Sequence, residues 1–342
     1  TATVEIPKSW LGLKFSADEK YLYASGGNDN RILKYAVLSN KSKLVDSIKL
    51  GDKWPVKISP SGIEIDDAKH IMYVVTKENN SLYVIDLLTK QIKLQTALGG
   101  EAYTCLLSND KAELYITCWG CDKVIVYNTA QNKIVDNVSV GDNPNDMCLS
   151  KSGQYLFVAN ANDNSVSVID IKKRMVLETL NAALYPNSIP GSGTNSVALS
   201  ADEKTLYIAN ADNNCLSVFD VSTPGSSKSK GFIPVGWYPT VVRVSGNKIF
   251  VANGKGFTSL ANPYGPSPVN DNEKLSYPLL NKLYPAKEIA IKYDGDLKDT
   301  DHHLQVAKEC MAKTGVFKQI YYSLVNISFL WRYILWPANE IN

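Results

Sequence analysis

Residues 150–170 read SKSGQYLFVANANDNSVSVID, and a closely similar stretch, SADEKTLYIANADNNCLSVFD, occupies residues 200–220. Each stretch contains a polar turn, a short apolar strand, a loop rich in Asn and Asp, and a second strand of alternating character. Asn and Asp tolerate positive φ and bond their own backbone, which makes such loops typical of hairpins. Each stretch therefore predicts two antiparallel strands joined by a tight loop.

The same unit recurs along most of the chain. Further copies occupy residues 16–35, 66–86 and 108–127, and a partial copy, VSGNKIFVANG, occupies 244–254. The aromatic residue of the second strand recurs at spacings of 50, 42, 42, 50 and 43, at Tyr23, Tyr73, Tyr115, Phe157, Tyr207 and Phe250. A period of about 40 to 50 residues is typical of one four-stranded propeller blade. We predict an all-β fold, a β-propeller with six recognisable blades and a seventh that closes the ring.

The two ends of the chain depart from this repeat. We assign residues 1–298 to the propeller, with clear repeats over 4–255 and irregular chain over 256–298, and residues 299–342 to a helical or irregular extension. The opening TATVEIP matches an outer strand without its own blade, so we expect it to complete the seventh blade with carboxyl-terminal strands. The apolar stretch 320–336 is slightly short for a membrane span, and we expect it to pack on the propeller rim or on a partner.

Composition excludes several classes of function. A net charge of +2 with scattered basic residues argues against nucleic-acid binding. No Gly-rich phosphate loop precedes a helix and no Gly-x-Ser-x-Gly elbow occurs, so we expect no cofactor. We also expect no metal, because the run from Asp294 to His303 matches no calcium loop and is typical of a solvated helix start.

Cys118 and Cys121 in TCWGCDK raise the possibility of a redox or zinc motif. A redox C-x-x-C precedes a helix in a βαβ unit, and a zinc site needs a second ligand pair. Neither context is present in the sequence, and alignment of the repeats places both cysteines in a hairpin loop. We therefore favour a structural role, and the six cysteines do not fix the redox compartment.

Aromatic residues collect where each blade begins. Strand direction reverses at every turn, so the Asn/Asp loops and the G-x-x-P connections emerge on one face, called here the upper face. Aromatic side chains at a concave mouth provide contact area at low entropic cost, although they can also merely cap the grooves between blades. We predict a ligand-binding site on the upper face, formed by Trp54, Tyr103, Trp119, Asn143, Tyr185, Trp237 and Tyr238.

The repeats YLFVANANDNSVSVID and TLYIANADNNCLSVFD resemble the YVTN repeat of the YncE-like seven-bladed propellers, over roughly residues 4–255. ITCWGCDKVIVYNT and GWYPTVVRVSGNKIFVANGKGFTSLANPYGP are similar to the propeller half of bacterial proteins that also carry an alkaline-phosphatase-like domain. These resemblances imply an exported protein, in the periplasm or at the cell surface. The chemistry of the phosphatase-like domain does not carry over, because the chain has only three histidines and no metal-ligand cluster.

The sequence leaves three functions open. We favour a non-catalytic binding module whose upper face holds a small molecule, a peptide or a cell-surface partner. A lactonase-type hydrolase is the main alternative, and it requires acid/base or metal-ligand residues at the mouth of the channel. The third possibility is the accessory half of a truncated phosphoesterase.

Overall fold

In a computed structural model, the structure describes residues 6, 8–9, 11–38, 41–53, 55–184 and 190–256. These residues belong to the first of two compact units, Thr1–Thr258, and the second unit, Ser259–Asn342, is not described further. The predicted composite blade, the helix over 299–315 and the apolar stretch 320–336 therefore lie outside the described residues.

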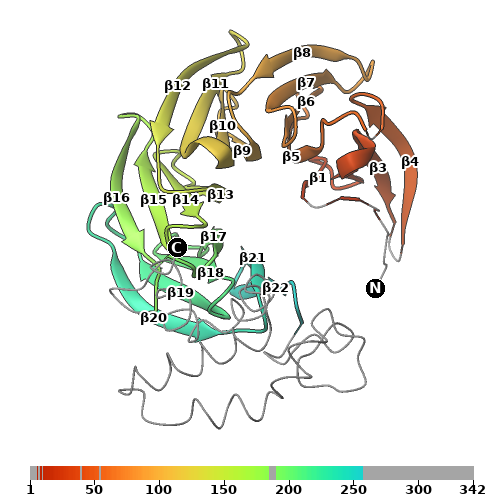
Figure 1. The fold of residues 1–342 in the computed structure, drawn as a ribbon. Coiled ribbons are helices and arrows are strands. Elements are labelled where there is room, and N and C mark those ends of the chain that lie inside the picture. The colour runs from red at the N-terminus through yellow and green to blue at the C-terminus, as the bar shows by residue number, and fades with distance from the viewer. Residues whose placement is uncertain are drawn as a thin grey trace, which may run out of the picture. The chain divides into compact units, whose positions relative to one another are not determined.

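The described chain forms five four-stranded antiparallel sheets and one two-stranded sheet, which confirms the propeller prediction. We number these sheets as blades 1 to 6 in chain order. Within each complete blade the strands follow sequence order from the inside outward. Figure 1 shows the inner strands toward the centre of an arc and the outer strands along its outside.

Blade 1 consists of β1 (Leu13–Phe15), β2 (Tyr21–Ser25), β3 (Arg31–Val37) and β4 (Ser42–Lys49). Blade 2 consists of β5 (Pro60–Asp66), β6 (Ile71–Thr76), β7 (Ser81–Asp86) and β8 (Ile92–Ala97). Blade 3 consists of β9 (Ala102–Leu107), β10 (Glu113–Cys118), β11 (Lys123–Asn128) and β12 (Lys133–Ser139). Blade 4 consists of β13 (Pro144–Leu149), β14 (Tyr155–Asn160), β15 (Ser165–Asp170) and β16 (Met175–Asn181). Blade 5 consists of β17 (Thr194–Leu199), β18 (Thr205–Asn210), β19 (Cys215–Asp220) and β20 (Lys228–Pro234). Blade 6 has β21 (Pro239–Ser245) and β22 (Lys248–Asn253). Two 3-10 helices, η1 (Gly27–Asp29) and η2 (Trp119–Cys121), lie in the loops after β2 and β10.

Burial explains why the repeat is so regular. The second and third strands of blades 2 to 5 are buried over most of their length, whereas the outer strand β8 is mostly exposed. Each hydrophobic core lies between two neighbouring blades: Tyr73 and Leu82 of blade 2, for example, share a core with Ile116 and Tyr127 of blade 3. β-branched and aromatic residues suit this pleated, two-sided packing.

The Asn/Asp loops join neighbouring blades on the upper face. The last loop residue before the third strand has positive φ in each complete blade, at Asn30, Asn80, Asp122, Asn164 and Asn214. In four of these blades its side-chain oxygen accepts a backbone N–H from the next blade. The donors are Ser59 for Asn30, Asn143 for Asp122, Ser192 for Asn164 and Tyr238 for Asn214. Asn and Asp are suited to this position because they tolerate the left-handed conformation and also supply the acceptor.

The glycine of the G-x-x-P connection is required by close packing. A Cβ atom on Gly141 would lie 2.7 Å from Asn160 Nδ2 and 2.4 Å from Asp163 Oδ2. A Cβ atom on Gly236 would meet Asn253 in the same way, 2.5 Å from its Nδ2 atom. In both cases the glycine of the G-x-x-P connection packs against the asparagine that ends the second strand of the blade which the connection enters.

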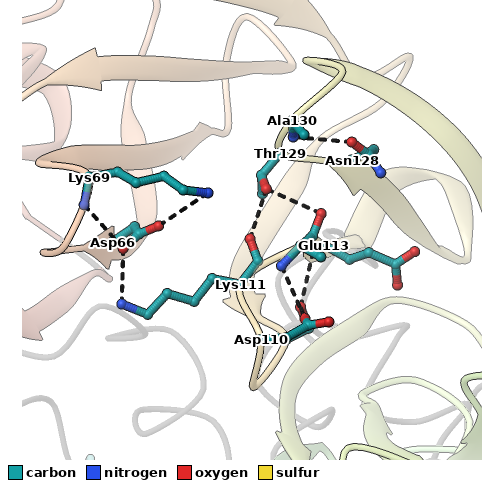
Figure 2. A network of polar contacts seen from close by, with 10 residues as sticks. Asp66, Lys69, Asp110, Lys111, Glu113, Asn128, Thr129 and Ala130 are labelled. Atoms are coloured by element: carbon teal, nitrogen blue, oxygen red, sulfur yellow. Dashed lines mark hydrogen bonds and ion pairs between the residues drawn. The ribbon is translucent and has the colours of Figure 1, made fainter.

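The opposite face also joins neighbouring blades, as Figure 2 shows for blades 2 and 3. Lys111 Nζ of blade 3 lies 2.9 Å from Asp66 Oδ1 of blade 2, and Lys69 Nζ lies 3.7 Å from Asp66 Oδ2. The Asp66 side chain is only 2% exposed. Burial alone would raise the pKa of Asp66, but its hydrogen bond and charge interaction with Lys111, assisted by Lys69, lower that pKa below its ordinary value.

Candidate functional site

The inner strands of blades 3 to 6 bring a set of polar side chains together near the upper face. Each of β9, β13, β17 and β21 has a register shift close to its start. Bulges of this kind redirect side chains and are frequent beside functional sites. We call the resulting group the inner-rim cluster, which consists of Tyr103, Asn145, Asp146, Asn195, Ser196, Tyr238 and Arg243.

Arg243 is the central cation of the inner-rim cluster. Its Nη1 atom donates to Asp146 Oδ2 at 2.7 Å and to Ser196 Oγ at 3.0 Å. Ser196 Oγ in turn donates to Asp146 Oδ2 at 2.5 Å. The three residues come from blades 6, 4 and 5, so the ion pair spans the intervening blade. The Arg243 side chain is 57% exposed and that of Asp146 only 16%, so the pair presents the guanidinium to solvent.

Burial alone would lower the pKa of Arg243, but the charge of Asp146 and its hydrogen bond raise it, so the guanidinium stays charged.

Two amides and a phenol form the upper part of the cluster. Asn145 Nδ2 donates to Asn195 Oδ1 at 3.1 Å, and the Tyr238 hydroxyl is hydrogen-bonded to the Asn195 side chain. Asn145 is 4% exposed, and its Oδ1 atom has no hydrogen-bond partner among the described residues. A buried acceptor of this kind normally bonds to protein, water or a ligand. A hydroxyl donor placed here would satisfy it.

Tyr103 lies beside the same group. Burial, assisted by the charge interactions with Asp146 and Tyr238, raises the pKa of Tyr103 to about 12, and the charge of Arg243 opposes that rise. The phenol is therefore neutral at physiological pH and can donate a hydrogen bond to a ligand oxygen. It is not suited to act as a base under those conditions.

A second ion pair lies at the matching level of blades 1 and 2. In the strand register, Lys14 stands opposite Tyr23 and Glu64 stands opposite Tyr73, as Arg243 stands opposite Phe250. The three charged residues therefore hold equivalent positions on their inner strands. Lys14 Nζ contacts Glu64 Oε1, and the Glu64 side chain is 9% exposed. Burial raises the pKa of Glu64, and the charge of Lys14 opposes that rise. The inner strands thus carry two largely buried carboxylates, Glu64 and Asp146, each of which is ion-paired with a more exposed cation.

The residues predicted to form the ligand-binding site on the upper face do not all lie together. Tyr103 and Tyr238 belong to the inner-rim cluster, whereas Trp119 and Asn143 meet at the boundary of blades 3 and 4, where Asn143 Nδ2 donates to the Trp119 carbonyl at 2.8 Å. Trp237 lies beside Lys255, whose Nζ atom is 5.4 Å from the Trp237 ring centroid and 4.3 Å from that of Tyr238. Trp54 and Tyr185 lie outside the described residues. Ligand binding by these residues remains a prediction.

Cys118 and Cys121 are joined by a disulfide across η2, with Cα atoms 5.4 Å apart. Cys105, Cys148 and Cys215 are free.

Among the residues that the structure describes, no group of three or more His, Cys, Asp or Glu side chains is arranged to hold a metal ion. The run from Asp294 to His303 lies outside these residues. Over the same described part of the chain, no helix has the length and apolar character required to cross a bilayer.

Sequence reasoning missed Asn145, Asp146, Asn195, Ser196 and Arg243. Aligning the repeats offered one usable signal: Asp146 and Ser196 are polar residues at the position that Gly62 holds in blade 2. Arg243 likewise holds the position of the charged Lys14 and Glu64. The Arg243–Asp146 pairing itself joins residues 97 positions apart and depends on the radial arrangement of the blades.

The comparisons with known proteins support this architecture. The family model described as lactonase, seven-bladed β-propeller, matches residues 107–256. Antigen Lp49 of Leptospira interrogans is 32% identical over 69 residues, which is 20% of this chain and only 15% of the antigen.

Solved propellers resemble the chain more extensively. The periplasmic gluconolactonase of Pseudomonas aeruginosa has a TM-score of 0.61 at 19% identity, with 71% of this chain and 78% of that chain covered. A protein from Lactobacillus plantarum has a TM-score of 0.62 at 18% identity, with 71% of this chain and 76% of that chain covered. A putative 6-phosphogluconolactonase from Bacteroides fragilis has a TM-score of 0.60 at 16% identity, with 71% of this chain and 76% of that chain covered. In fold, this chain is a β-propeller, and over residues 107–256 it is similar to the seven-bladed lactonase propellers.

Proposed function

We propose that this propeller is a binding module that holds a small hydroxylated molecule, such as a sugar acid or its lactone, at the inner-rim cluster. The observation that carries the proposal is the buried Asn145 Oδ1 atom, which has no hydrogen-bond partner among the described residues although it lies among polar groups from three neighbouring blades. A ligand hydroxyl would supply the missing donor.

The chemistry of the cluster suits such a ligand. Sugar hydroxyls both donate and accept, and the amides of Asn145 and Asn195 offer both functions. The ring faces of Tyr103 and Tyr238 add apolar area for the carbon skeleton. The exposed guanidinium of Arg243 would bind the carboxylate of a sugar acid. Binding sites commonly combine a few placed polar groups with aromatic walls in this way.

Isothermal titration with gluconate and with glucono-δ-lactone tests the proposal on the intact chain. Y103F removes one hydroxyl and N195A one amide, and each should weaken binding by about 5-fold to 160-fold, as expected for a lost hydrogen bond of about 1 to 3 kcal/mol. Y35F is the matched control, because Tyr35 is a buried phenol of blade 1 away from the cluster. Equal affinities in all four proteins would place any ligand elsewhere, and no heat with either compound would argue against this ligand class.

Lactone hydrolysis at the same cluster is the second candidate, favoured by the Asp146–Arg243 pair and by the family match over residues 107–256, which includes both. Asp146 would accept a proton from water as the water oxygen bonds to the lactone carbonyl carbon. Arg243 and Tyr103 would stabilise the carbonyl oxygen. The ring C–O bond would then break, and the protonated Asp146 would return its proton to the leaving ring oxygen to give the open hydroxy acid.

Acid release from glucono-δ-lactone separates the two candidates. For a hydrolase, D146N should reduce the enzyme-dependent rate by at least about 100-fold, within the usual range for a general base, while titrations still detect gluconate. For a binding module, the wild-type rate equals the uncatalysed rate although gluconate binds. D142N is a suitable control, since Asp142 is an exposed carboxylate of the same connection.

We also propose a periplasmic or cell-surface location, in keeping with the family resemblance. The Cys118–Cys121 disulfide supports it, because stable disulfides are characteristic of oxidising compartments. Fractionation of the native cells tests this directly, and recovery of the protein only in the cytosolic fraction would contradict it.

A further inference from the structure

The loop between the second and third strands of a blade is closed by the residue that ends the second strand. In blade 4, Asn160 Nδ2 donates to Ser165 Oγ and Ser167 Oγ, each at 2.9 Å. In blade 5, Asn210 Nδ2 donates to Ser217 Oγ at 2.8 Å. In blade 2, Thr76 Oγ1 accepts the Ser81 N–H at 3.0 Å. A polar side chain on one strand and a hydroxyl residue on the other therefore recur.

Blade 3 lacks both parts of this arrangement. Its second strand ends at Cys118, which pairs with Lys123, and the position two residues further on is Ile125. Asn160 pairs with Ser165, and Ser167 follows two residues later, so Lys123 and Ile125 replace the two serines. The Cys118–Cys121 disulfide thus stands where blades 2, 4 and 5 have a hydrogen bond. A reduced Cys118, which is 0% exposed, would find no hydroxyl partner at these two positions.

The loop that this disulfide closes also joins blade 3 to its surroundings. The Gly120 N–H donates to the Glu101 carbonyl at 3.1 Å, within the connection that begins blade 3. The Asn143 side chain of blade 4 donates to the Trp119 carbonyl, and its backbone N–H donates to Asp122 Oδ1 at 3.1 Å. Opening the loop would therefore loosen the boundary between blades 3 and 4.

The two sulfurs differ in accessibility. Cys118 is fully buried, whereas Cys121 is partly exposed in the loop. The neighbouring connection contributes Gly100 at this point, and a Cβ atom there would lie 2.9 Å from Cys121 Sγ and 3.0 Å from Cys118 Sγ. Glycine therefore allows the connection to approach the disulfide without a side chain between them. Access is one of the factors that decide which sulfur a thiolate attacks.

We propose that Cys118–Cys121 is a site of thiol–disulfide exchange, and that its redox state sets whether the loop over residues 119–122 is closed. A thiolate of a dithiol attacks Cys121 Sγ, the bond between the two sulfurs breaks, and Cys118 leaves as a thiolate that takes up a proton. The second thiol of the reagent then attacks the mixed disulfide and releases the Cys121 thiol. Cys118 and Cys121 are reduced by two electrons, and the dithiol is oxidised to a cyclic disulfide.

Hydrogen exchange on the full-length native protein tests this, with dithiothreitol as the dithiol and alkylation followed by mass spectrometry to verify reduction. We expect the Gly120 and Asn143 amides to exchange at least about fivefold faster after reduction, as for the loss of a hydrogen bond of about 1 kcal/mol. Core amides such as Val126 should keep their protection. Reoxidation should restore the original rates.

The chain itself provides a matched control. The triple variant C118N/C121D/K123S copies the loop-closing residues Asn160, Asp163 and Ser165 of blade 4, so a hydrogen bond replaces the disulfide. Its Gly120 and Asn143 amides should be protected and indifferent to dithiothreitol. The proposal is overturned if exchange at these amides is unchanged in fully reduced wild-type protein. It is equally overturned if the disulfide is reduced only when the whole propeller unfolds.

Discussion

The backbone N–H of Asn143 donates a hydrogen bond to Asp122 Oδ1 across the boundary between blades 4 and 3, at 3.1 Å. Both residues have positive φ, 53° for Asn143 and 51° for Asp122. The same relationship links Tyr238 to Asn214, where the distance is 2.8 Å. The accepting residue, Asp122 or Asn214, thus performs two tasks. It tolerates the left-handed backbone conformation, and its side chain links its blade to the next.

Substitutions at Asn214 should separate these two tasks. N214G keeps the backbone freedom and loses only the hydrogen bond to Tyr238, so we expect it to lower the free energy of unfolding by about 0.5 to 1.5 kcal/mol. N214A also forces a Cβ-bearing residue without a polar side chain into positive φ, which should add about 1 kcal/mol or more. Urea unfolding of both variants gives the comparison. Equal stabilities for the two would mean that the conformation contributes nothing.

A methyl group at Gly141 should disturb the connection into blade 4. G141A places a Cβ atom 2.7 Å from Asn160 Nδ2, and overpacking of this kind typically costs about 1 to 3 kcal/mol. The exposed Asp163 side chain can turn away, but Asn160 is fully buried and cannot. The G141A change should therefore cost less when made in an N160A background. Additive effects in this double-mutant cycle would show that the two residues do not compete for space.

The Asp66–Lys111 contact should make stability depend on pH. The pKa of Asp66 is lower in the folded protein than in an unfolded chain, so its contribution is present above the unfolded pKa. That contribution is lost as the pH falls through the folded pKa. D66N should lower the free energy of unfolding by about 1 to 3 kcal/mol at pH 7, as for a buried charged hydrogen bond. The difference between D66N and wild type should shrink steadily in acid. D67N at the neighbouring carboxylate is a suitable comparison for the size of the effect.

The buried thiols should be inert in the folded protein. Burial raises the pKa of Cys105 and of Cys215, and both side chains are almost fully covered. Because the thiolate is the reactive species, iodoacetamide at pH 8 should label neither residue until the protein is unfolded. Peptide mass spectrometry with and without guanidinium gives the answer. Rapid labelling of Cys105 in native protein would show that the core between blades 2 and 3 opens readily.

Much of the fold follows from local patterns in the sequence. The two strands predicted within residues 150–170 are β14, Tyr155–Asn160, and β15, Ser165–Asp170, on either side of the predicted Asn/Asp loop. Turn chemistry and period-two alternation are short-range signals, so a single sequence carries them in full. The repeat length then identifies the blade, because each copy supplies the same four strands.

The candidate site could be predicted only in part. Tyr103 and Tyr238 stood out because large aromatics at connections are conspicuous in a sequence. Asp146 and Arg243 looked like ordinary polar residues of inner strands, and nothing local indicates that they meet across blade 5. Likewise, the spacing of Cys118 and Cys121 is compatible with a disulfide, free thiols or metal ligands, and only the conformation of η2 brings their sulfurs together.

The placement of the hydrophobic cores between blades also bears on how such a protein can change over evolutionary time. Tyr73 of blade 2 packs against residues of blade 3, and Tyr115 of blade 3 packs against residues of blade 4. Blades 2 to 5 therefore each present an apolar face to both neighbours. Duplication or loss of one whole repeat preserves these contacts, whereas a deletion of half a repeat exposes an apolar face. Gene rearrangements that respect the blade period are thus the ones this architecture tolerates.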